Sequence, residues 1–270
     1  MNEQYKKALQ RDRRVKVFGE RNTGTRAVMK MLRALEGVSI ATPTIPTPDL
    51  DMLLARAEET LTDFHLELFR DALEDIRRSR FGAISDWKHA APQIDDSYAA
   101  KSASVLFLVR DPYSWMVSFY RNPYHSRAPK PDTIEGMLRQ PWLALERDHV
   151  ERVLLSPMML WNAKLRAYRD FANAAPVPSA VLYFEDFVRA PVPALKKALS
   201  RFDISADGLA EIEETTKETG MNRATRMAYY QNEDWKKELT PEAVQLINTY
   251  VDWDVATSFG YKLRTAEDFT

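Results

Sequence analysis

The segment GERNTGT at residues 19–25 has the composition of a loop that binds phosphate or sulfate. It follows an apolar run at residues 15–18 and precedes apolar residues that recur at helical spacing from Arg26 onward. Backbone amides at a helix N-terminus bind anion oxygens, and the helix dipole favours negative charge there. Gly24 would let the backbone approach an anion closely. The segment therefore predicts an anion site, while an ordinary turn between strand and helix stays open as the alternative.

The two glycines of this loop have the spacing of a nucleoside-triphosphate P-loop, but its Lys-Ser/Thr pair is missing. Thr25 and Arg26 stand in that place. Triphosphatases need the lysine on the phosphates and the hydroxyl on magnesium. A phosphotransferase with a divergent loop and a magnesium-binding Asp111 stays open as an alternative, against which the missing lysine and the following Pro112 count.

A second candidate anion site follows the uninterrupted apolar run at residues 105–109. Arg110 ends this run, and Ser118 comes eight residues later (118 − 110), which is about two turns into a helix opened by Pro112. Open α/β sheets bind ligands at the carboxyl ends of their strands, and arginine supplies both charge and a fork of donors. Arg110 and Ser118 are thus predicted to converge on one phosphate. The alternative is an Arg110–Asp111 ion pair with Ser118 as a small packing residue.

His89 is the candidate general base, within WKHAAP at residues 87–92. An imidazole with a pKa near ~6.5 accepts a proton at neutral pH, and the adjacent Lys88 would stabilise developing charge. A packed or surface histidine is the alternative. His125 and His149 are weaker candidates in a predicted lid, and His65 is expected on a helix surface.

Alternating strands and helices must position these residues. We predict strands at residues 15–18, 81–87, 105–109 and 180–184, and helices from 26, over 50–78 with one break, from 112, and over 150–171, 191–202 and 241–250. Such alternation implies right-handed crossovers, and the run at 105–109 suits a strand buried on both faces. The predicted fold class is α/β: a single-domain, P-loop-like, three-layer fold with a central parallel sheet flanked by helices. The domain spans residues 1–270, with a polar N-terminal extension at 1–14 and a lid or acceptor region at 121–150.

Composition excludes several classes of function. The 270 residues carry 38 basic and 39 acidic side chains, and this balance does not suggest a nucleic-acid partner. The absence of cysteine excludes disulfides, thiolate metal sites and a cysteine nucleophile, and the four histidines lack metal-ligand spacing. No run approaches the ~20 apolar residues of a membrane span, and the N-terminus lacks a signal-peptide core. We expect a cytoplasmic protein without a metal.

The two anion motifs and the histidine segment together resemble sulfotransferases that use 3′-phosphoadenosine-5′-phosphosulfate (PAPS). RNTGTRAVMKML at residues 21–32 resembles the 5′-phosphosulfate loop of that family, especially RKGGTRALLEML of its heparan sulfate branch. LVRDPYSWMVSFYR at residues 108–121 resembles the 3′-phosphate motif, and WKHAAP resembles the K-T-H-x-P stretch that holds the family's basic histidine. The resemblance implies transfer of a sulfuryl group from PAPS to a hydroxyl or amine, with 3′-phosphoadenosine-5′-phosphate (PAP) as product and no metal.

By this resemblance, His89, Lys88 and Asn22 would be catalytic, and Arg110 and Ser118 would hold the 3′-phosphate. The loop residues around the sulfonate and 5′-phosphate would be Arg21, Asn22, Thr23, Gly24, Thr25 and Arg26. Phe184 lies where the family ends a strand with Y-E-D-L and would pack on adenine. The segment at 234–240 resembles one that closes over the nucleotide, and Arg223 and Arg226 precede it where an arginine commonly meets the 3′-phosphate.

One departure concerns Asn22, which stands where many family members have a lysine that stabilises the leaving bridging oxygen. Another cation would then compensate, with Arg21, Arg26 and Lys88 as candidates, or the chain would bind PAPS or PAP without turnover. The resemblance spans residues 15–263 and suggests a small-molecule, carbohydrate or lipid acceptor. The absence of a membrane anchor from the sequence leads us to expect a bacterial cytoplasmic enzyme rather than a Golgi-resident one. It indicates neither the acceptor nor the oligomeric state.

Overall fold

A computed structural model describes residues 13–41, 48–126, 128–211 and 223–269. Its centre is a sheet of four parallel strands in the order β2-β1-β3-β6. These strands are β1 (Arg13–Gly19), β2 (Val38–Ala41), β3 (Ala103–Val109) and β6 (Ser179–Tyr183). The register pairs Gly19 with Leu108 and Val109 with Tyr183, so β1, β3 and β6 end at one edge of the sheet.

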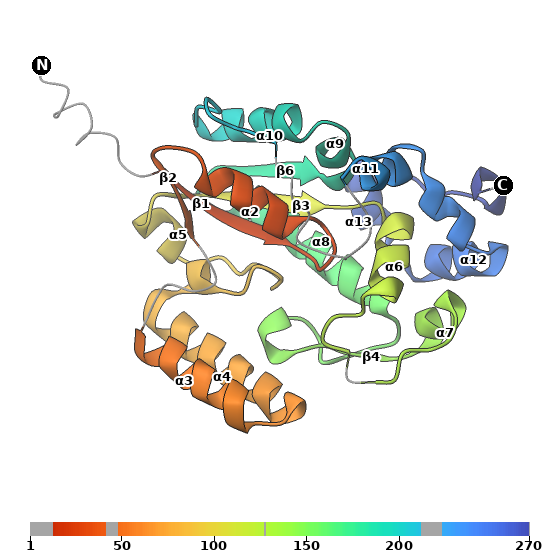
Figure 1. The fold of residues 1–270 in the computed structure, drawn as a ribbon, viewed down its shortest axis with the longest axis horizontal. Helices are drawn as coiled ribbons and strands as arrows, with labels where there is room; N and C mark the ends of the chain where they lie inside the picture. The colour runs from red at the N-terminus through yellow and green to blue at the C-terminus, as the bar shows by residue number, and fades with distance from the viewer. Residues whose placement is uncertain (1–12, 42–47, 127, 212–222, 270) are drawn as a thin grey trace, which may run out of the picture.

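Helices cover both faces of this sheet (Figure 1). On β3, Leu106 and Leu108 pack with the apolar side of α2 (Thr25–Arg33) and α10 (Pro191–Leu199). Val105, Phe107 and Val109 alternate with them and pack on the opposite side with α6 (Pro112–Arg121), α8 (Pro157–Ala174) and α12 (Pro241–Tyr250). Because successive side chains of a strand point to opposite faces, this division confirms the α/β fold with a central parallel sheet between helical layers.

The other elements surround this centre. They are α3 (Pro48–Thr60), α4 (Asp63–Phe81), α5 (Ser97–Ala100), α7 (Ile134–Arg139), α9 (Phe184–Arg189), α11 (Arg223–Gln231), α13 (Trp253–Ser258), five 3-10 turns η1 (Ala83–Ser85), η2 (Glu146–Asp148), η3 (Ser200–Phe202), η4 (Asp234–Glu238) and η5 (Ala266–Phe269), and the antiparallel pair β4 (Trp142–Leu143) and β5 (Val153–Leu154). Helices α3 and α4 form a hairpin set apart from the sheet (Figure 1). None of the helices in the described ranges combines the length and apolar character needed to cross a membrane.

The strand predicted at residues 81–87 is wrong. Helix α4 continues to Phe81, Gly82 has a φ of 79°, and η1 follows at once. The amides of Ala83 and Ile84 donate to the side chains of Asp95 and Ser97, so side chains satisfy backbone groups that a strand would pair. The edge strand next to β1 is instead β2, which the sequence analysis missed. The helix predicted at 150–171 begins later, at Pro157, where Ser156 caps it.

Candidate functional site

The loop between β1 and α2 is shaped by close packing at its glycines. A Cβ on Gly19 would lie 2.7 Å from Oγ1 of Thr23 and 2.9 Å from Cβ of Leu108, so no larger residue fits there. Thr23 is buried and its hydroxyl donates to the carbonyl of Glu20 at 2.6 Å, which tightens the turn. Gly24 has a φ of 86° and precedes the first residue of α2, and no described side chain caps that helix end. The loop thus presents helix N-terminal amides, as an anion site requires.

Asn22 links this loop to the neighbouring strand. It has a φ of 67°, a left-handed conformation that asparagine tolerates better than most residues. Its side-chain amide is 3.4 Å from the carbonyl of Asn122, just past α6. Its own carbonyl accepts a hydrogen bond from Nη1 of Arg110 at 2.7 Å. The two anion motifs of the sequence are therefore in direct contact.

Arg110 is almost completely buried, with 1% of its surface exposed. Its Nε donates to Oγ of Ser114 at 3.0 Å, and its guanidinium carbon lies 4.0 Å from the Phe184 ring centroid and 4.9 Å from that of Tyr230. Among the described residues, Nη2 of Arg110 is buried and has no hydrogen-bond partner. A buried donor on a charged group is costly to leave unpaired, so this nitrogen is a candidate donor to a bound anion.

Ser118 lies on α6 at the same edge, and its hydroxyl is 3.3 Å from the hydroxyl of Tyr230 on α11. Burial raises the pKa of Tyr230, but the nearby Arg110 charge and the hydrogen bond with Ser118 bring it below its ordinary value of 10.0. Tyr230 therefore joins the two predicted ligands, Arg110 and Ser118, into one cluster. The sequence analysis missed this tyrosine, whose only signal was its place shortly before the segment at 234–240.

Phe184, the first residue of α9, packs against both loop and arginine. A Cβ on Gly24 would lie 3.6 Å from its ring, and the Tyr230 ring stands edge-on to it at 5.0 Å. The contact of Phe184 with an adenine stays a prediction. Arg223 and Arg226 belong to α11, but their side chains lie outside what the structure describes.

His89 lies at the carboxyl end of β1. Its Nδ1 is 2.5 Å from the carbonyl oxygen of Gly19, while the amide of Gly19 donates to the carbonyl of Lys88 at 3.0 Å. A carbonyl oxygen only accepts, so Nδ1 carries the hydrogen and Nε2 carries the lone pair. Burial and the charges of Arg21 and Lys88 hold the pKa of His89 well below 6.5. This histidine is thus neutral at pH 7 and has the tautomer of a base acting through Nε2.

Arg21 is held by carboxylates. It is buried, its Nη1 lies 2.8 Å from Glu20, and its fork contacts both carboxylate oxygens of Asp148 at 3.2 Å. The indole Nε1 of Trp115 donates to the backbone carbonyl of Arg21 at 3.0 Å, which holds the loop against α6. The charge of Arg21 is largely matched within this group, and Asp148 is a second residue that the sequence analysis did not single out.

The remaining candidates have different surroundings. Thr25 is buried, Arg26 is exposed and Lys88 is half-buried. His125 lies 3.5 Å from Glu67, and His149 lies 3.6 Å from Asp86. Within the described ranges, no group of three or more His, Asp or Glu side chains is arranged to hold a metal ion.

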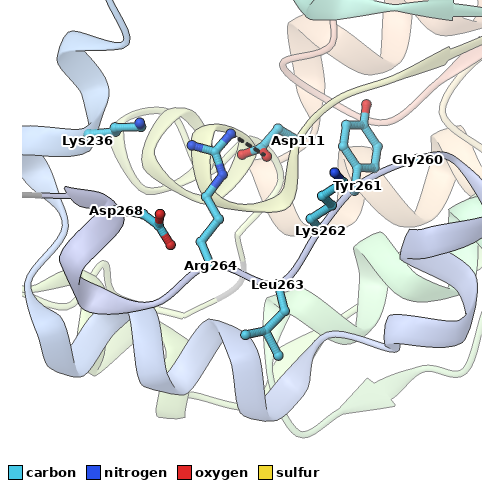
Figure 2. Close-up of a pocket in the computed structure, with 8 residues that line it drawn as sticks. All are labelled: Asp111, Lys236, Gly260, Tyr261, Lys262, Leu263, Arg264 and Asp268. Atoms are coloured by element: carbon cyan, nitrogen blue, oxygen red, sulfur yellow. Dashed lines mark ion pairs between the residues drawn. The ribbon is translucent and has the colours of Figure 1, made fainter.

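Asp111 follows Arg110, but its carboxylate is used to cap the N-terminus of α6. Its carboxylate accepts from the amides of Tyr113 and Ser114 at 3.0 Å, so it caps α6, and it lies 3.7 Å from Arg264. Figure 2 shows this ion pair at a cavity of about 370 Å³, which is lined by Asp111, Lys236, Gly260, Tyr261, Lys262, Leu263, Arg264 and Asp268. A carboxylate used as a helix cap is poorly placed to serve as a magnesium ligand.

Comparison with known proteins gives structural similarity only. No protein-family profile matches the chain, and no curated protein sequence matches it. A sulfotransferase domain from the curacin biosynthetic pathway is similar with a TM-score of 0.46 and 12% identity, over 93% of this chain and 98% of that domain. The chain is thus similar to a sulfotransferase domain over most of its length. The sulfotransferase domain of the Synechococcus PCC 7002 olefin synthase has a TM-score of 0.40 and 14% identity, over 93% and 95% of the two chains.

Proposed function

We propose that this protein is a PAPS-dependent sulfotransferase acting on a hydroxyl or amine. The observation that carries the proposal is the buried guanidinium of Arg110, whose Nη2 has no partner among the described residues. An anion there would accept a hydrogen bond from Nη2. The hydroxyls of Ser118 and Tyr230 lie 3.3 Å apart in the same cluster. The site therefore fits a phosphate bound by one arginine and two hydroxyls.

The positions of the two anion sites favour PAPS over a nucleoside triphosphate. The register of β1 and β3 places the α2 N-terminus and Arg110 at the ends of adjacent strands. A nucleotide with phosphate on both its 3′ and 5′ sides matches two separate sites, whereas a triphosphate concentrates its charge on one side. We assign Arg110, Ser118 and Tyr230 to the 3′-phosphate. We assign the amides of residues 22 and 24–26 to the 5′-phosphosulfate, because the Thr23 amide donates to the carbonyl of Glu20. PAPS would supply an activated sulfuryl group, with PAP as the product.

We propose His89 as the base that takes the acceptor's proton. Its Nε2 carries the lone pair because Nδ1 donates to Gly19, and its lowered pKa keeps it neutral at pH 7. Asn22 brings no charge to the loop, and Arg21 is already matched by Glu20 and Asp148. We propose Lys88 as the compensating cation, because its charge lies close enough to His89 to lower the pKa of the imidazole.

A non-catalytic PAP-binding protein is the second candidate function. Asn22 favours it, because its amide donates to the carbonyl of Asn122 and adds no charge at the predicted leaving group. Both candidates bind PAP, and only the first transfers sulfate. The acceptor is proposed to be a small molecule, carbohydrate or lipid, in a cytoplasmic setting.

The test is binding of PAP, measured by calorimetry and by thermal stabilisation with and without magnesium. A ligand at 100 times its Kd stabilises the native state by about 2.7 kcal/mol. We expect metal-independent binding that Arg110→Ala abolishes. Arg77→Ala removes another buried arginine, paired with Glu74 on α4, and serves as the matched control. Magnesium-dependent binding of ATP without binding of PAP would instead favour a phosphotransferase. Turnover of PAPS in an acceptor screen then separates the enzyme from the binder.

A further inference from the structure

Lys164 is a buried lysine on α8 that contacts the segment carrying His89. Its side chain is 0% exposed. Its Nζ lies 2.5 Å from the carbonyl oxygen of His89, 2.7 Å from the carbonyl oxygen of Asp148 and 2.9 Å from Oδ1 of Asp148. An ammonium has three N–H donors and here meets three acceptors. Every donor of Lys164 is therefore used, and one of them holds the backbone of the candidate base.

Burying an ammonium is costly even when it is paired, and an apolar side chain would often stabilise the same position as well. Packing alone therefore does not account for a lysine here. What the lysine adds is a link between α8, the segment around His89, η2 and the loop after β1, where its Nζ lies 3.9 Å from Oε2 of Glu20. Asp148 on η2 extends the link, because its carboxylate also holds Arg21 of the loop.

The contacts fix His89 at two points. Lys164 holds its backbone carbonyl, and the Gly19 carbonyl holds Nδ1 of its ring. Because the backbone carbonyl and the ring nitrogen Nδ1 are both held, contacts with α8 and β1 together determine the direction in which Nε2 points. The indole of Trp87 stands edge-on to the imidazole at 4.9 Å and limits its rotation further.

We propose that Lys164 is a positioning residue that fixes the backbone of His89 so that Nδ1 donates to Gly19 and Nε2 faces the acceptor. The inference rests on the proposed role of His89 as the base. Lys164 itself would touch neither PAPS nor acceptor, because its three donors are already used within the protein.

The charges around His89 give this role a measurable signature. Three cations face the imidazole from different elements: Arg21 from the loop, Lys88 from its own segment and Lys164 from α8, and each lowers the pKa of His89. Removing Lys164 takes away one of these charges and releases the backbone. Loss of the charge should raise the pKa of His89, and release of the backbone should allow the Nε2–H tautomer to appear.

The experiment is a pH titration of the histidine ring nitrogens by NMR, with His89→Asn used to assign the His89 signals among the four histidines. In the wild type, neutral His89 should be in the Nδ1–H form. In Lys164→Met, we expect a mixture of tautomers and a higher pKa of His89. Asn162→Ala is the matched control, because Asn162 lies on the same helix, is buried and anchors Tyr250 at 2.7 Å without contacting His89.

Several outcomes would overturn the proposal. An Nε2–H tautomer in the wild type would do so without any variant. Unchanged tautomer and pKa in a folded Lys164→Met protein, or the same change in Asn162→Ala, would also do so. If Lys164→Met does not fold, Lys164→Gln keeps donors in place and should give a smaller change in the same direction, and no change there would again refute the role.

PAP binding separates this proposal from the proposed function. Lys164→Met should weaken PAP binding much less than Arg110→Ala does, because Lys164 contacts neither Arg110 nor Ser118 and lies 3.9 Å from Glu20 of the loop. A wild type that does not bind PAP would refute the proposed function, while the NMR result would still report whether Lys164 positions His89.

Discussion

Nη1 of Arg110 donates to the backbone carbonyl of Asn22 at 2.7 Å, so the end of β3 is tied to the loop that follows β1. The same guanidinium leaves Nη2 without a partner among the described residues. One arginine therefore both shapes the first anion site and offers a donor at the second. This dual contact makes the arginine's geometry, and not only its charge, important for binding.

Arg110→Lys should lose PAP affinity although it keeps the positive charge. A lysine has no planar fork with which to contact Asn22, Ser114 and an anion at once. We expect at least a tenfold rise in Kd, which corresponds to about 1.4 kcal/mol. Calorimetry measures it, and equal affinity in Arg110→Lys would show that charge alone is used.

Tyr230→Phe should weaken PAP binding about tenfold, since hydrogen bonds to charged groups contribute roughly 1.5–3 kcal/mol. Tyr229→Phe is the control, because the neighbouring hydroxyl donates to Glu238 and not to Ser118. Equal losses in both variants would indicate a general effect on α11 and remove Tyr230 from the anion site.

The acid limb of the activity profile should lie well below pH 6.5. Neutral His89 is the active base, and burial with nearby cations lowers its pKa in the folded protein. Activity should stay level from pH 8 to about 6.5 and fall only at lower pH. A kcat/KM profile that falls with a midpoint at 6.5 or above contradicts this assignment.

The same shift affects stability. In the unfolded chain His89 takes up a proton near pH 6.5, while in the folded chain it stays neutral. Its contribution to the free energy of unfolding is therefore present above pH 6.5 and is lost as the pH falls toward the folded-state pKa. His89→Asn should flatten this part of the stability curve, as measured by urea unfolding.

Glu185 should act in the opposite direction. Burial, together with the nearby charge of Asp111, raises its pKa from 4.5 to about 7. A raised acid pKa contributes stability below pH 4.5 that is lost as the pH rises through about 7. Between pH 5 and pH 8 the wild type should lose this contribution, whereas Glu185→Gln has no carboxyl to ionise. The free energy of unfolding of the variant should therefore rise relative to that of the wild type by about 1–3 kcal/mol over this interval. Urea unfolding at the two pH values measures this, and an equal difference at both would contradict the raised pKa.

Asn22→Lys should raise kcat in a competent sulfotransferase, because it supplies a cation at the predicted leaving group. It should also cost about 1 kcal/mol of stability, since Asn22 has a φ of 67° that lysine adopts less readily. Asn22→Gly tests the backbone effect separately, with no strain and no added charge. An Asn22→Lys protein that binds PAP and remains inactive with every acceptor would support the non-catalytic binder.

The local sequence determined the strand–loop–helix units that carry the site. The apolar run at 105–109 has no alternation, which suits a strand buried on both faces, and Arg110 follows its last residue. The polar residues at 20–25 indicated a turn, and the structure gives Asn22 and Gly24 left-handed backbone conformations there. Such features depend on neighbours in the chain, and for this reason they could be predicted without the structure.

Tertiary packing decided the rest, because it joins residues that are far apart in the chain. Arg21 was predicted beside a sulfonate, but the structure pairs it with Asp148, 127 residues away. Tyr230 meets Ser118 across 112 residues, and Lys164 reaches His89 across 75. No local pattern distinguishes a lysine buried on α8 from one on a solvent-facing helix. The sequence alone therefore determined which residues could bind an anion or take a proton, and only the fold decided which of them are held by other charges and which donor is left for a ligand.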